Sequence, residues 1–106
     1  MTVQSPETLE REAEVYCDMV LTGQKPVALV PTSDMAVIDV AARKGLDTVF
    51  VSGDGIYIVP KGQVAFYAAI ITLANHEQAP TRHWIRGHLL GYSEKAILEH
   101  IERGGP

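Results

Sequence analysis

The segment from Gln63 to Asn75 constrains the fold most, because it is apolar nearly all round and contains no Asp, Glu, Lys or Arg. Its core, Val64 to Ala74, has 11 residues, well short of the ~20 that an α-helix needs to span a bilayer. The length and the alanines favour a helix, whereas Ile70-Ile71-Thr72 is also compatible with a strand. We expect an element this apolar to lie at the centre of the hydrophobic core.

The whole chain has the size and composition of one globular domain, residues 1–106. It has 106 residues, of which 46% are hydrophobic and 21% are charged. A single cysteine excludes an intramolecular disulfide framework and the zinc sites built on two or more cysteines. The N-terminus has neither a basic segment nor an apolar segment of the kind that directs export, so we expect a cytoplasmic location.

The first predicted element is an amphipathic helix. Ser5 and Pro6 have the helix-start pattern of an N-cap followed by proline, and the helix is expected to run to about Leu21. One side of this helix is apolar, with Leu9, Ala13, Tyr16 and Val20. The other side is acidic, with Glu7, Glu10, Glu14 and Asp18. Residues 5–21 account for the whole formal net charge of −4, because the remaining acids and bases balance.

The middle of the chain predicts a small sheet. Strands are expected at 27–30, 48–51 and 56–59, with a helix at 34–44 between the first two. Ser52-Gly53-Asp54-Gly55 predicts the tight turn of a hairpin, since its glycines tolerate positive φ. The first two strands are interpreted as parallel neighbours joined by a right-handed crossover, which gives a three-stranded mixed sheet.

Two further helices follow the apolar segment, at 79–90 and 94–103. The expected order is α-β-α-β-β-α-α-α. The predicted class is α+β, or small α/β, with the sheet covered by helices and with a helical hairpin at the C-terminus.

Residues 82–103 contain the most specific motif. Gly87 precedes the turn glycine, Gly91, by four positions, and Ile97 follows Gly91 by six. This spacing lets two helices approach at Gly87, turn at Gly91 and pack around Ile97. The stretch resembles the helix-turn-helix of bacterial regulators, in which a turn like this leads into the recognition helix. The resemblance implies DNA contact through Arg82, Arg86, Ser93, Glu94, Lys95 and Leu98.

The second helix of this motif departs from that family in its charge. Its three glutamates outnumber Lys95 and Arg103, giving a net charge of −1 where a recognition helix usually meets phosphates. A helical hairpin that only serves the core, or that contacts a protein, is therefore an alternative interpretation.

Other patterns are weak signals for chemistry. His83 and His88 lie five residues apart, which places them on different sides of a helix, so no metal site is predicted. A ring contact between Trp84 and His88 is the simpler expectation for His88. Cys17 is expected to be a packed thiol rather than a nucleophile. No cofactor is implied.

Three functional hypotheses follow. The first is a small non-enzymatic regulatory protein that binds a macromolecular partner, similar in type to the small inhibitors of phages and mobile elements such as anti-CRISPR proteins. The acidic side of the first helix (Glu7, Glu10, Glu14 and Asp18) is its predicted partner-binding surface. The second is a helix-turn-helix regulator, with a homodimer as an option. The third is a small enzyme or ligand binder that uses the loop Pro31-Thr32-Ser33-Asp34 together with Asp54.

Overall fold

The structure, a computed structural model, describes residues 6–103. The predicted order α-β-α-β-β-α-α-α and the α+β class are confirmed. The elements are α1 (Pro6–Leu21), β1 (Ala28–Val30), α2 (Ala36–Arg43), β2 (Asp47–Val51), β3 (Gly55–Val59), α3 (Val64–His76), α4 (Thr81–Leu89) and α5 (Glu94–Glu102). The predicted N-cap, Ser5, lies outside the described residues.

The sheet corrects the expectation of a parallel pair in a mixed sheet. Its strand order is β1-β3-β2, and β3 pairs antiparallel with both neighbours. The short hairpin turn brings β3 back against β2, and β1 then pairs with the other edge of β3. Glycine is needed at position 55, where φ is +129° and a Cβ atom would lie 2.8 Å from the Cα of Pro31.

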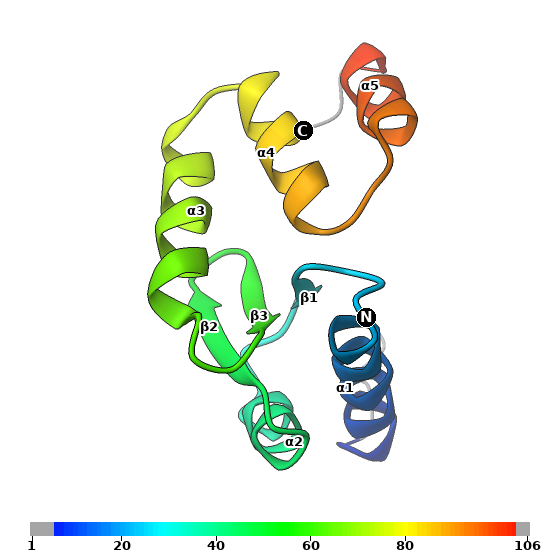
Figure 1. Cartoon of the computed structure of the whole chain (residues 1–106), viewed down its shortest axis with the longest axis vertical. Coiled ribbons are helices and arrows are strands. Elements are labelled where there is room, and N and C mark those ends of the chain that lie inside the picture. Colours follow the sequence, from blue (N-terminus) through cyan, green and yellow to red (C-terminus); the bar gives the residue numbers. More distant parts are fainter. Residues whose placement is uncertain (1–5, 104–106) are drawn as a thin grey trace.

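Helices cover both faces of this sheet, as Figure 1 shows for α1 and α2 on one side and α3 on the other. Alternating residues of β3 serve the two layers. Ile56 and Ile58 pack against α1 and α2, whereas Tyr57 and Val59 pack against α3 and the end of α4. The fold therefore has two hydrophobic layers separated by one thin sheet.

Helix α1 buries nearly the predicted face, and α2 packs in the same hydrophobic layer. In α1, Leu9, Ala13 and Val20 are buried, whereas Tyr16 is half-buried and packs at the edge of the layer. Cys17 is fully buried, as expected for a packed thiol, and burial raises its pKa to about 11. In α2 the buried residues are Val37, Val40 and Ala41.

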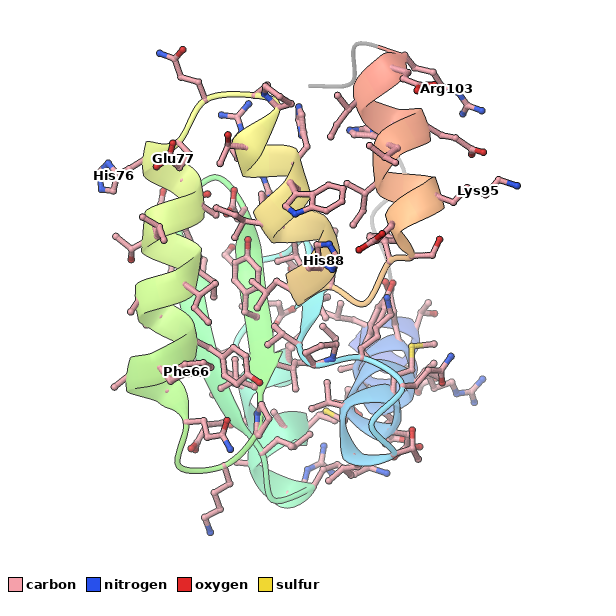
Figure 2. The ribbon with its side chains drawn as sticks, turned by 45° about the horizontal axis from the view of Figure 1, so that its top comes forward. Phe66, His76, Glu77, His88, Lys95 and Arg103 are labelled. Atoms are coloured by element: carbon pink, nitrogen blue, oxygen red, sulfur yellow. The ribbon has the colours of Figure 1, made fainter. Side chains whose placement is uncertain are left out.

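Helix α3 corrects the expectation that the apolar segment lies at the centre of the core. It is a helix, yet only Ile71 and Ala74 are buried. The helix forms one flank of the molecule in both views (Figures 1 and 2). The physical reason is the width of the sheet: three short strands offer one surface for α3 to pack against, and its opposite side faces outward. No helix within residues 6–103 is long and apolar enough to cross a membrane.

Candidate functional site

Helices α4 and α5 lie together at the end of the molecule away from α2 (Figure 1). They meet where the backbone of Gly87 contacts the side chain of Ile97, the pair that the sequence spacing singled out. Ser93 caps α5, because its Oγ accepts a hydrogen bond from the Ala96 N–H at 3.2 Å. The turn between the helices contains Gly91 with φ +84°.

Lys25 anchors this turn to the rest of the fold. Its Nζ donates a hydrogen bond to the carbonyl oxygen of Leu90 at 2.8 Å and lies 5.0 Å from the centre of the Tyr92 ring. The hydrogen bond joins the segment after α1 to the turn after α4 across 65 residues of sequence, and the ring contact joins the same two segments. Lys25 thus contributes to holding the helix pair in place.

A cavity of about 540 Å³ opens between α4 and α5. Its apolar lining comes from Gly87, Leu90, Ala96 and Ile97, with Tyr92 beside them. Its polar lining comes from His83, Arg86, Glu99, His100 and Arg103. We call this space the α4–α5 cavity. A second, smaller cavity of the same helix pair, about 420 Å³, is lined by Pro80, Thr81, Trp84, Leu98 and Ile101.

His83 is an unusual member of the cavity lining. Only 9% of its surface is exposed, and its Nε2 atom has no hydrogen-bond partner among the described residues. Its ring meets that of His100 edge to face, with 5.0 Å between the ring centres. Buried polar atoms are nearly always paired, so a buried nitrogen of this kind indicates a place that another molecule can satisfy.

A second polar cluster surrounds Asp54 in the hairpin turn. Its Oδ2 accepts hydrogen bonds from the Tyr57 hydroxyl at 2.8 Å and from the Asn75 amide at 3.3 Å. Its Oδ1 lies 3.9 Å from the nearest guanidinium nitrogen of Arg86. The cluster therefore ties the hairpin to α3 and α4. Burial, and then the hydrogen bond to Asp54, raise the pKa of Tyr57 to about 12.

The outward side of α3 carries two large exposed apolar side chains. Phe66 and Leu73 expose 60% and 55% of their surface. At 100° per residue they share an arc of about 120° with three smaller side chains. We call this surface the α3 face; it consists of Ala65, Phe66, Ala69, Thr72 and Leu73, all exposed.

No protein-family model, curated protein or solved structure matches this chain.

The predicted acidic surface lies on α1, and its members Glu7, Glu10, Glu14 and Asp18 are all exposed. Asp18 also pairs with Lys44, the C-cap residue of α2, with 3.2 Å between carboxylate and ammonium. The α1 helix packs on the face of the sheet opposite to α3. The acidic surface and the α3 face are thus on different sides of the molecule.

The residues predicted to contact DNA lie on α4, at the start of α5 and along α5. Arg86 faces Asp54, and the Ser93 hydroxyl is used to cap α5. Arg82 is half-buried, while Glu94, Lys95 and Leu98 are exposed on α5. Figure 2 shows Lys95 pointing away from α4.

Side chains of the loop at 31–34 make local hydrogen bonds just before α2. The Asp34 N–H donates to Thr32 Oγ1 at 3.2 Å, and Asp34 Oδ1 accepts from the Ala36 N–H at 2.9 Å. Neither Ser33 nor Asp54 lines either of the two cavities described above.

Three of the four histidines make ring contacts, His83 with His100 and His88 with Trp84. Trp84 and His88 make the predicted ring contact, with 4.8 Å between ring centres. No group of three metal-ligating side chains converges within the described part of the chain. Pairing of His83 with His100 was not foreseen, because it joins different helices and no sequence spacing encodes it.

Proposed function

We propose that this chain is a non-enzymatic interaction protein that binds a protein partner through the α3 face. The observation that carries the proposal is that α3, a helix without charged side chains, exposes large apolar residues to solvent. Residues 64–75 contain no Asp, Glu, Lys or Arg, yet Phe66 and Leu73 each expose more than half of their surface. Large exposed apolar patches on folded proteins commonly mark interaction sites.

The energetics favour this surface over the acidic side of α1 as the source of affinity. Burying an aromatic or aliphatic side chain completely contributes roughly 1.5–3 kcal/mol, so two such anchors are enough to form the centre of an interface. Exposed carboxylates mainly change the association rate and its salt dependence. Glu7, Glu10, Glu14 and Asp18 are accordingly proposed to steer a basic partner surface rather than to hold it.

A flat partner contacts only one of these two surfaces at a time, because α1 and α3 cover opposite faces of the sheet. A small inhibitor of the phage or mobile-element type would bind through the α3 face and so cover the active site or a binding surface of its target. The affinity for the partner is therefore assigned to α3. The carboxylates of α1 are assigned an effect on the association rate.

Site-specific photo-crosslinking tests the proposal. A benzophenone amino acid at position 66 is expected to capture one discrete protein in cells of the native host. The same group at position 15, an apolar residue of α1 that is 53% exposed, is the matched control. With the captured partner purified, Phe66→Glu with Leu73→Glu is expected to weaken binding at least 100-fold, and Val15→Glu with Leu21→Glu to leave it unchanged.

Two outcomes would contradict the proposal. Equal capture from positions 66 and 15 would show that the α3 face has no special role. Crosslinks that join two copies of the chain would make the α3 face a homodimer interface instead of a surface for a different protein. Light scattering of the wild type and of the double variant distinguishes these cases.

DNA binding is the second candidate, favoured by the close packing of Gly87 on Ile97, two residues whose spacing carries the helix-turn-helix resemblance. Its weakness is electrostatic, because Arg86 lies near Asp54 and α5 exposes three glutamates. If it is right, duplex DNA binds at low salt, and Arg82→Gln with Lys95→Gln weakens binding and reduces its salt dependence. Absence of binding to duplex DNA at 20 mM salt would remove this candidate.

A further inference from the structure

We propose that the α4–α5 cavity binds a small organic carboxylate with an apolar body. This site is separate from the α3 face and does not depend on the proposed protein partner. At about 540 Å³ the cavity has the volume of a small-molecule site, and it is larger than a simple inorganic anion requires. Its lining combines an apolar floor with cationic groups, which suits a molecule that has both parts.

The charge of the lining selects an anion. Arg86 and Arg103 contribute two guanidinium groups, and Glu99 is the one carboxylate that lines the cavity. Because Arg86 also lies 3.9 Å from the carboxylate of Asp54, the excess of positive charge is small, and it suits a monocarboxylate better than a dianionic phosphate. Guanidinium groups bind carboxylates through paired, charge-assisted hydrogen bonds.

The buried His83 supplies an independent observation. Its Nε2 has no partner among the described residues although the side chain is nine-tenths buried. His100, in ring contact with His83, lines the same cavity. The Nε2 atom is itself buried, so the proposed site requires the His83 ring to turn before a carboxylate oxygen can accept a hydrogen bond from it.

The floor supplies the apolar half of the site. Gly87 and Ile97 are buried where the two helices touch, and Leu90 and Ala96 extend the apolar lining. Ile97 fills the space beside Gly87, so the floor is closed at this point and the apolar part of a ligand rests against Leu90 and Ala96. An aromatic ring or a short alkyl chain fits such a floor, with its carboxylate directed to the arginines.

Binding of defined probes to the full chain tests the site. Benzoate, phenylacetate and hexanoate are each compared with the corresponding neutral amide by following amide chemical shifts in NMR. At least one carboxylate is expected to bind with a shift pattern centred on Gly87, Ile97 and His100, and at least about tenfold more tightly than its amide. Arg103→Gln is expected to weaken that carboxylate about tenfold.

The control variant is Lys95→Gln, which removes a cation of the same helix that does not line the cavity. It is expected to leave carboxylate affinity unchanged, and His83→Asn is expected to weaken it. The proposal is overturned if none of the three carboxylates shifts α4 and α5 resonances at 20 mM, or if acids and amides bind equally. It is also overturned if inorganic phosphate binds as tightly as the best carboxylate, because the site would then recognise charge alone.

Discussion

A Cβ atom added to Gly87 would lie 2.7 Å from the Cδ1 atom of Ile97, so the backbone of α4 and the side chain of α5 meet in direct contact. Ile97 is 3% exposed and has little room to move. The spacing of these residues in the sequence already predicted the contact. The structure adds that it forms the floor of the α4–α5 cavity.

Gly87→Ala tests this contact. Alanine favours a helix over glycine by about 1 kcal/mol, whereas overpacking a filled contact costs about 1–3 kcal/mol. We expect a net decrease of about 1 kcal/mol in the free energy of unfolding, measured with urea. Ile97→Ala alone opens a cavity, which the Gly87→Ala methyl partly fills in the double variant. A double-mutant cycle should show favourable coupling of about 1 kcal/mol; simple additivity would contradict the contact.

The raised pKa of Tyr57 predicts that the free energy of unfolding depends on pH in the alkaline range. Its pKa is raised from 10.0 to about 12 in the folded protein, first by burial and then by the hydrogen bond to Asp54. Between these values the unfolded chain has lost the phenolic proton while the folded chain retains it. Stability from this group is therefore complete below pH 10 and decreases as pH rises from 10 to 12, by up to about 3 kcal/mol.

The measurement is urea unfolding at several pH values from 8 to 11.5. Tyr57→Phe should remove most of this pH dependence, because phenylalanine cannot ionise. Absorbance at 295 nm gives a second reading, in which the wild type gains a phenolate signal near pH 12 that Tyr57→Phe does not. Identical alkaline slopes for the wild type and Tyr57→Phe would show that Tyr57 does not ionise late.

We expect Lys25 to stabilise the packing of α4 and α5 on the rest of the fold. Lys25→Met keeps most of the side-chain length but removes the hydrogen bond to the Leu90 carbonyl and the contact with the Tyr92 ring. Together these contribute about 1–2 kcal/mol. Amide hydrogen exchange in α4 and α5 should accelerate more than in α1. Lys61→Met, at an exposed position, is the control; an equal effect of both variants would refute the anchoring role.

Local patterns in the sequence predict much of this fold. Prolines, glycines and apolar periodicity define the helices and the hairpin, and the pair Gly87 and Ile97 defines the packing of α4 on α5. Strand order was not predictable in the same way, because local signals do not specify which edge of β3 receives β1. The position of α3 was missed because hydrophobicity reports a tendency to be buried and not what covers the helix.

The polar clusters were hidden for a related reason. Asp54, Tyr57 and Asn75 come from a turn, a strand and a helix, and His83 and His100 come from two helices. Tertiary structure alone brings such residues together. The residues of the acidic surface were easier to place, since Glu7, Glu10 and Glu14 share one helix and follow its period.

Helix α3 offers a direct comparison of its two sides. Leu73 is 55% exposed and Ile71 is 2% exposed, although both are large aliphatic residues of the same helix. Leu73→Ser should change the free energy of unfolding by no more than about 0.5 kcal/mol, whereas Ile71→Ser should lower it by at least about 3 kcal/mol. Urea unfolding of the isolated chain at low concentration measures both. Equal, large losses would mean that the α3 face is already covered in the isolated protein, and its assignment as an open binding surface would then be wrong.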